Sequence, residues 1–131
     1  MSPKKQRVIL MGLSRSEIQK TFEHSPQLEN MLSAAAFCFK EIHLVCFHEE
    51  VFHPLGLTSK LFVLEHELAH LVFPSEWNEL NVDSLAFQHM KQAGDHLQEI
   101  ELEKILVNDT IPSRQARLLN FNMYLQYGQQ N

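Results

Sequence analysis

The sequence predicts an α+β fold in a single domain that spans residues 1–131. Short β-rich runs are confined to the amino-terminal part, whereas apolar residues at helical spacing dominate the carboxy-terminal half. No linker rich in Gly, Pro or Ser divides the chain. A length of 131 residues with 44% hydrophobic residues suits one domain with one core.

Two apolar runs are expected to form strands. Residues 7–11 are β-rich and end at Gly12. Residues 41–47 show the clearer pattern, because apolar side chains recur at every second position. This run and residues 51–52 are expected to pair as a hairpin.

Helices are expected over most of the remaining chain. Ser14 or Ser16 can cap a first helix that runs to about His24. Ser75 can cap a later helix that ends at Gly94. In chain order, the helices after the first are predicted over residues 27–40, 58–73, 76–93, 95–107 and 113–127.

Charge and hydropathy narrow the range of partners and compartments. The formal charge of −5 repels phosphate backbones, so nucleic acid is not expected as a partner. No apolar segment is long enough to span a bilayer, and the basic residues 1–7 precede an apolar run too short for a signal peptide. We expect a soluble, cytoplasmic protein without a membrane partner, and export that needs no signal stays compatible with the sequence. Cys38 and Cys46 form no CxxC pair and are expected to be two buried thiols.

One motif indicates a possible catalytic metal site, namely His66-Glu67-Leu68-Ala69-His70. On a helix, the two histidines lie one turn apart on the same face, so both imidazoles can bind one metal ion. Glu67 projects to the side of that face, where its carboxylate can hold a metal-bound water. The metal lowers the pKa of this water, Glu67 accepts its proton, and hydroxide attacks a carbonyl. The motif therefore predicts a zinc-dependent hydrolase.

A catalytic zinc ion needs a third protein ligand. Glu79 is the candidate, because a tight reversal after the motif helix would bring the next helix back and place Glu79 beside His70. Asp83 follows four residues later on the same face and can accept a hydrogen bond from a ligating imidazole. The alternative third ligands are Glu76, Asp83 and His89. A solvated acidic face is the other interpretation of Glu79 and Asp83.

Together with residues 79–86, the HExxH motif resembles the zincin metallopeptidases of the gluzincin type. The second block is similar to the E-x-x-A-D-x-x-A pattern of HtpX-like peptidases and the E-x-x-A-N-x-x-A pattern of ImmA/IrrE-like proteins. This resemblance implies a zincin-like fold with a small β-sheet beside the HExxH helix. It also implies one zinc ion per chain on His66, His70 and Glu79, with Glu67 as general base and Asp83 supporting the site.

Zincin folds also place an edge strand beside the motif helix, where an extended protein or peptide substrate pairs with it. The resemblance assigns this place to residues 41–47 or 51–52. It implies hydrolysis of peptide bonds with little sequence preference. The substrate itself and the oligomeric state are not fixed by the sequence.

Two further interpretations of the same residues stay open. The first is a catalytically inactive zinc-binding module for interaction or regulation, in which zinc contributes folding energy. The second is a metal-free helical domain in which the motif is a coincidence. Nickel, cobalt or manganese can also occupy such a ligand set.

The donor that would stabilise a developing oxyanion is not identified by the sequence. Trp77, near the bend after the motif, is expected to pack in the turn, and a place in the wall of the pocket is the alternative. The candidate oxyanion donors are His48, His53, His89, His96, Arg114, Tyr124 and Tyr127.

Overall fold

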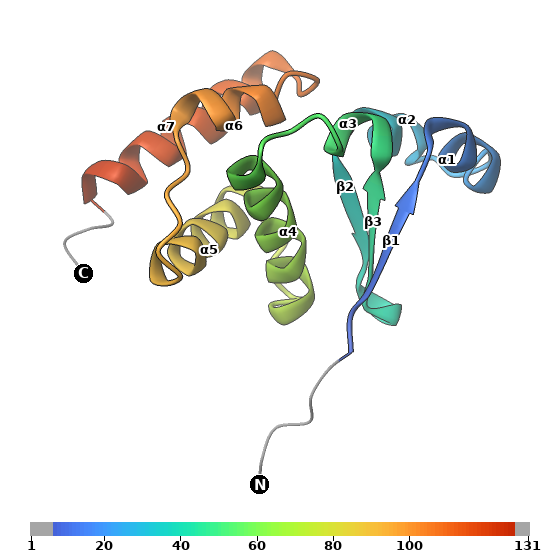
Figure 1. Cartoon of the computed structure of the whole chain (residues 1–131), viewed down its shortest axis with the longest axis horizontal. Helices are drawn as coiled ribbons and strands as arrows, with labels where there is room; N and C mark the ends of the chain where they lie inside the picture. The colour runs from blue at the N-terminus through green and yellow to red at the C-terminus, as the bar shows by residue number, and fades with distance from the viewer. Residues whose placement is uncertain (1–6, 128–131) are drawn as a thin grey trace, which may run out of the picture.

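The structure is a computed structural model that describes residues 7–127 (Figure 1). Residues 1–6, which include most of the basic amino-terminal segment, and residues 128–131 lie outside this range. The α+β class is confirmed. In chain order the elements are β1 (Ile9–Leu13), α1 (Arg15–Thr21), α2 (Leu28–Ser33), β2 (Ala36–Phe39), the 3-10 turn η1 (Lys40–Ile42), β3 (Leu44–His48), α3 (Glu49–Phe52), α4 (Leu57–Val72), α5 (Glu79–Gln92), α6 (Glu99–Ile105) and α7 (Ile111–Tyr127).

The sheet has three strands in the order β1-β3-β2. β1 runs parallel to β3, and β2 pairs with β3 in the antiparallel direction, with Ala36 opposite Phe47. The predicted hairpin between residues 41–47 and residues 51–52 was therefore wrong. Residues 44–48 form the central strand, but β2 precedes it in the chain, and residues 51–52 belong to the short helix α3.

The helix predicted over residues 27–40 was also wrong in its second half. α2 ends at Ser33, and Ala36–Phe39 is a strand. Phe37 and Phe39 pack against Phe22, with ring centroids 5.8 and 5.7 Å apart. The small residue Ala36 packs on the opposite face of the strand with Val63 of α4. Side chains on both faces of the strand pack against other segments, and this packing with the pairing to β3 outweighs the local helical pattern.

α4 lies between the sheet and the helices α5, α6 and α7 (Figure 1). On the side away from the sheet, α4 packs against α5, and α7 closes a second cluster with them. Phe62, Phe87 and Phe121 form the centre of this cluster, and the ring centroids of Phe62 and Phe87 are 5.3 Å apart. These contacts fix α5 relative to α4, which decides the geometry of the site described below.

The helix boundaries partly follow the predictions. Of the two candidate caps, Ser14 and not Ser16 begins α1, and Glu17 completes a capping box with it. α5 begins later than predicted, because Asn78 caps it in place of Ser75. The Asn78 Oδ1 accepts hydrogen bonds from the backbone N–H groups of Leu80 and Asn81 at 2.9 and 3.3 Å. α6 is shorter than predicted, and α7 begins at Ile111, so Pro112 lies in its first turn.

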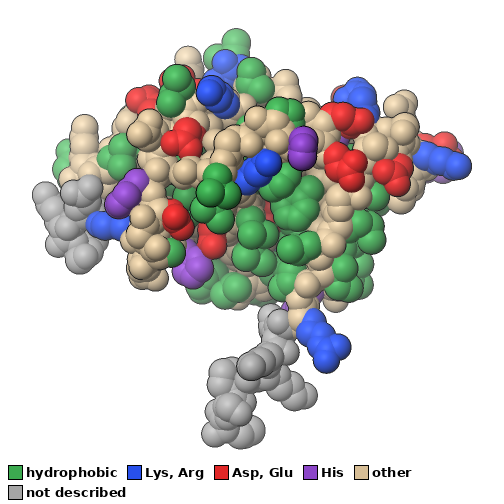
Figure 2. Space-filling model, in the orientation of Figure 1, with side chains coloured by type: hydrophobic (Ala, Val, Ile, Leu, Met, Phe, Trp, Pro, Cys, Tyr) green, Lys and Arg blue, Asp and Glu red, His purple; other side chains and the backbone are tan. Residues whose placement is uncertain are grey.

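The surface carries apolar side chains beyond the core. Ile9, Leu10 and Met11 of β1 are exposed, although they belong to the sheet. Figure 2 shows hydrophobic side chains gathered over the lower part of the molecule, on the face that is also seen in Figure 1. Within residues 7–127, no helix combines the length and apolar character needed to cross a membrane.

Candidate functional site

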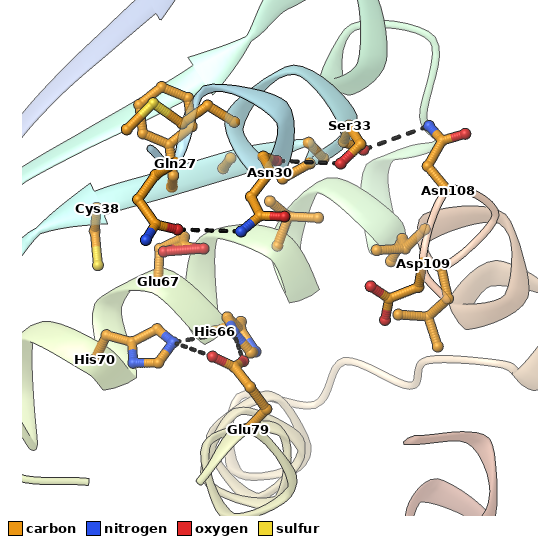
Figure 3. Close-up of a pocket in the computed structure, with 18 of the residues that line it drawn as sticks. Gln27, Asn30, Ser33, Cys38, His66, Glu67, His70, Glu79, Asn108 and Asp109 are labelled. Carbon is orange, nitrogen blue, oxygen red and sulfur yellow. Dashed lines mark hydrogen bonds and ion pairs between the residues drawn. The ribbon is translucent and has the colours of Figure 1, made fainter. Parts of the chain in front are cut away.

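The motif residues lie on the buried part of α4, on one wall of a cavity of about 640 Å³ (Figure 3). α4 is held by its apolar positions, which include the buried Phe62, Val63 and Leu71. His66, Glu67 and His70 lie among them with exposed fractions of only 8, 7 and 8%. Polar groups so deeply buried require partners, because an unpaired polar group is costly away from water.

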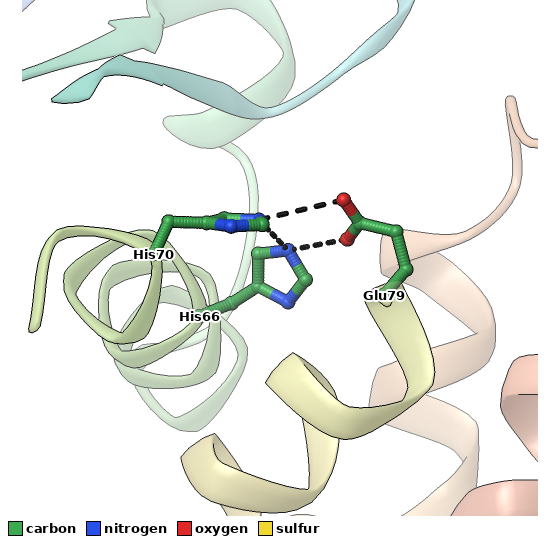
Figure 4. A group of neighbouring side chains, drawn as sticks. All are labelled: His66, His70 and Glu79. Atoms are coloured by element: carbon green, nitrogen blue, oxygen red, sulfur yellow. Dashed lines mark hydrogen bonds and ion pairs between the residues drawn. The ribbon is translucent and has the colours of Figure 1, made fainter. Parts of the chain in front are cut away.

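Glu79 supplies such a partner to both histidines (Figure 4). The turn after α4 brings the first residue of α5 back beside the motif. The Glu79 carboxylate oxygens lie 2.9 Å from Nε2 of His66 and 3.4 Å from Nε2 of His70. The two Nε2 atoms are 3.2 Å apart. The structure thus brings the three sequence-predicted residues to one point, with all donor atoms within 4.8 Å of one another.

The spacing of these donor atoms fits a tetrahedral cation. With metal–ligand bonds of about 2.0 Å, neighbouring ligand atoms of a tetrahedron are roughly 3.3 Å apart. The observed separations of 2.9 to 3.4 Å match this length. Two imidazoles and a carboxylate are also a donor set that zinc accepts. A cation can therefore fit with little movement of the side chains.

Asp83 holds the second nitrogen of His66. Nδ1 of His66 donates to Oδ1 of Asp83 at 2.7 Å, and Asp83 has no exposed surface. This contact leaves the Nε2 atom of His66 directed toward Glu79 and His70. The sequence placed Asp83 in this role from its position one helical turn after Glu79.

Arg117, on α7, clamps the same carboxylate. Its Nε and Nη2 groups each donate to Asp83 at 2.8 Å, which is the two-pronged geometry that suits a guanidinium and a carboxylate. Asp109 accepts a further hydrogen bond from Arg117 at 3.4 Å. Sequence analysis missed Arg117, because nothing in the local pattern of α7 links it to a residue 34 positions earlier.

The charges of this network alter the pKa values of its members. Burial lowers the pKa of His66, but the hydrogen bonds to Asp83 and Glu79 outweigh it and raise the pKa to about 10. Burial raises the pKa of Glu79, whereas the two histidines lower it by more, so that the pKa falls well below its usual value. Without a cation, a protonated His66 between two carboxylates balances the charge. A metal ion would displace that proton.

The rival third ligands lie elsewhere. The Glu76 carboxylate accepts a hydrogen bond from the Asn81 amide at 2.7 Å. His89 contacts Glu65 of α4. Among residues 7–127, the group of acidic and histidine side chains that could hold a metal contains neither Glu76 nor His89.

The opposite wall of the cavity is formed by β2, which pairs with β3 on one side only. The Cys38 thiol of β2 lies beside the Glu67 carboxylate (Figure 3). Burial, followed by the negative charge of Glu67, raises the pKa of this thiol to about 12. The strand next to the motif helix is therefore Ala36–Phe39, not residues 41–47 or 51–52 as predicted. Cys46 is buried as predicted, but Cys38 is only half-buried.

Two other expectations about the cavity change. Trp77 does not pack in the turn but is 75% exposed and lines the cavity. The seven candidate oxyanion donors, all of them within the described residues, do not line this cavity. The amide side chains of Gln27 and Asn30 reach it instead, and Figure 3 shows Gln27 directed toward Glu67. Sequence analysis missed these two residues, because they lie in α2 and at the position that precedes it, far from the motif in the chain.

Comparisons of the chain with protein-family models, with curated proteins and with solved structures find no match.

Proposed function

We propose that this protein is a zinc-dependent peptidase with a zincin-like arrangement, in which His66, His70 and Glu79 hold one zinc ion and Glu67 is the general base. The convergence of the three donor atoms at tetrahedral spacing carries the proposal. Glu67 is buried in the same cavity, adjacent in sequence to His66. Its carboxylate is thus available beside the cluster without being one of the three converging groups.

The proposed role of each residue follows from the position of its side chain. Zinc, when bound, acts as a Lewis acid toward a carbonyl oxygen and lowers the pKa of water. Glu67 accepts the proton of the attacking water and returns it to the leaving amine. Asp83, itself fixed by Arg117, keeps Nε2 of His66 facing the cluster.

The free edge of β2 offers a place for the substrate backbone. An extended peptide can add to this edge as a further strand, through backbone hydrogen bonds that require no particular side chains. Such a peptide would lie between β2 and α4, where Glu67 and the cluster are found. The cavity volume of about 640 Å³ suits a ligand of this kind.

A zinc module without catalysis is the second candidate, and the ligand count disfavours it. Structural zinc sites are closed by four protein ligands, whereas catalytic sites keep one position open. Among the described residues, the cluster offers three. The open cavity beside it is also unnecessary for a purely structural site.

The test is the Glu67→Gln variant, assayed on a pool of internally quenched peptides of mixed sequence. We expect hydrolysis to fall by about 10²- to 10⁴-fold, the usual contribution of a general base, with the zinc content unchanged. Glu65→Gln is the matched control, because Glu65 lies on the same helix but contacts His89. Hydrolysis that survives Glu67→Gln would remove Glu67 as the base. A zinc-loaded wild type without hydrolysis would favour the non-catalytic module.

A further inference from the structure

A contact between the two walls crosses one end of the cavity. Lys40 directly follows β2, and its Nζ donates a hydrogen bond to the carbonyl oxygen of Pro74 at 2.9 Å. The same ammonium group lies 3.5 Å from the centroid of the Trp77 ring. Pro74 and Trp77 belong to the turn between α4 and α5, and Lys40 and Trp77 both line the cavity. The contact therefore joins the end of β2 to the turn that leads to Glu79.

The contact at the other end of the cavity is weaker. There, the Asn108 amide donates to the carbonyl oxygen of Ser33 at 3.4 Å, and Figure 3 shows Asn108 on the side remote from Cys38 and His70. This distance exceeds the usual range for an N–H···O hydrogen bond, and both groups are neutral. The Lys40 ammonium group makes a charge-assisted hydrogen bond and also lies over the ring of Trp77. Tryptophan is the aromatic residue that binds cations best. The end at Lys40 is thus the more firmly closed.

The closed end lies close to the proposed general base. Cys38 is beside Glu67, and Lys40 is two positions further along the chain. Two residues of extended chain span roughly 7 Å, since a strand rises about 3.3 Å per residue. A peptide that pairs with β2 therefore has room for about two residues between the scissile bond and the Lys40 contact.

We infer that Lys40 and Trp77 close one end of the substrate cleft, so that the enzyme trims about one or two residues from the end of a peptide and does not cut internal segments. This inference rests on the proposed function and names its substrate class as peptides with a free end. An internal segment would need to pass between Lys40 and Trp77, which are in contact.

The test compares a pool of linear octapeptides of mixed sequence with the same pool after head-to-tail cyclisation. Wild type is expected to release single residues or dipeptides from the linear pool, as identified by mass spectrometry, and to leave the cyclic pool uncut. Lys40→Ala is expected to raise cleavage of cyclic relative to linear peptides at least about tenfold. The matched control is Lys60→Ala, because Lys60 also lies near an aromatic ring, 5.6 Å from the centroid of Phe52, but does not line the cavity.

A second measurement does not depend on turnover. Trp77 is the one tryptophan of the chain, so its emission reports directly on the closed end. In the Glu67→Gln protein, the linear pool should change this emission and the cyclic pool should not. In Glu67→Gln combined with Lys40→Ala, both pools should change it.

The outcomes separate this inference from the proposed function. Equal cleavage of linear and cyclic pools by wild type, or an unchanged ratio in Lys40→Ala, would overturn the inference and leave the peptidase intact. Absence of hydrolysis in every variant would defeat the proposed function instead. In that case the Trp77 emission still tests whether Lys40 and Trp77 close the cleft. A response to linear peptides alone supports the closure, and an equal response to both pools overturns it.

Discussion

The Asp83 carboxylate, which has no exposed surface, accepts a hydrogen bond from Nδ1 of His66 at 2.7 Å. It also accepts two hydrogen bonds from Arg117, so that a residue of the carboxy-terminal helix α7 supports the orientation of a motif imidazole. The candidate metal site is therefore built from three helices, although all its converging donors lie on α4 and α5.

Replacement of Arg117 by Met is expected to weaken both the fold and the site. The change leaves the buried Asp83 carboxylate without its guanidinium partner, and breaking a buried ion pair from one side costs about 3–5 kcal/mol. We expect a loss of this order in the free energy of unfolding, measured by urea titration with circular dichroism on metal-free protein. Zinc affinity, measured by competition with a chelator, should fall about 10- to 100-fold because His66 loses its fixed orientation.

Arg114→Met is the control for that experiment. Arg114 lies on the same helix, and its guanidinium donates to the Val107 carbonyl oxygen at 3.3 Å, away from Asp83. It should retain the zinc affinity of wild type. Equal losses of zinc affinity in both variants would show that α7 acts through general stability and not through Asp83.

Glu79 and Glu76 offer a matched pair for the identity of the third ligand. Glu79→Ala removes one of the three converging donors. Loss of a group that only orients a ligand lowers metal affinity by up to about 100-fold, so the loss of zinc affinity in Glu79→Ala should be larger. Glu76→Ala removes a carboxylate that contacts Asn81 and should leave zinc affinity unchanged. Isothermal titration with zinc in both variants measures the difference. The reverse order of affinities would make Glu76 the ligand.

The Cys38 thiol should report on the charge of Glu67. Burial and the Glu67 carboxylate raise the pKa of Cys38 to about 12, so the thiolate is scarce at pH 8 and alkylation by iodoacetamide should be slow. Glu67→Gln removes a charge that disfavours the thiolate, hence the pKa falls and the rate rises. A decrease of one pKa unit raises the thiolate fraction at pH 8 about tenfold, and the alkylation rate rises by less because a less basic thiolate is a weaker nucleophile.

This measurement is made on metal-free protein, with mass spectrometry to distinguish Cys38 from the buried Cys46. Glu65→Gln is again the control, since its carboxylate contacts His89. The same alkylation rate in Glu67→Gln and wild type would mean that Glu67 does not face Cys38 in solution.

The parts of the structure that were predicted correctly depend on local patterns. α4 was predicted from its apolar periodicity and its end near Pro74, and Ser14 was one of two serines predicted to cap α1. The approach of Glu79 to His70 also follows from a local feature, namely the reversal of the chain between two consecutive helices. In each case the residues that determine the structure lie within a few positions of one another.

The parts that were missed depend on contacts between distant segments. β2 is a strand because it pairs with β3 and buries Phe37 and Phe39 against Phe22, none of which is visible in a helical spacing. Arg117 became part of the site only through the packing of α7 on α5. Asn78 replaced Ser75 as a cap because the turn after α4 extends further than the shortest reversal.

The metal content of purified protein shows whether His66, His70 and Glu79 bind a metal ion. Wild type and His70→Ala, prepared in parallel and exchanged into the same buffer with a trace of zinc, are measured by inductively coupled plasma mass spectrometry. The geometry of His66, His70 and Glu79 predicts about one zinc ion per wild-type chain, and a small fraction of that in His70→Ala. Wild type without stoichiometric metal, or equal zinc in both proteins, would contradict the account.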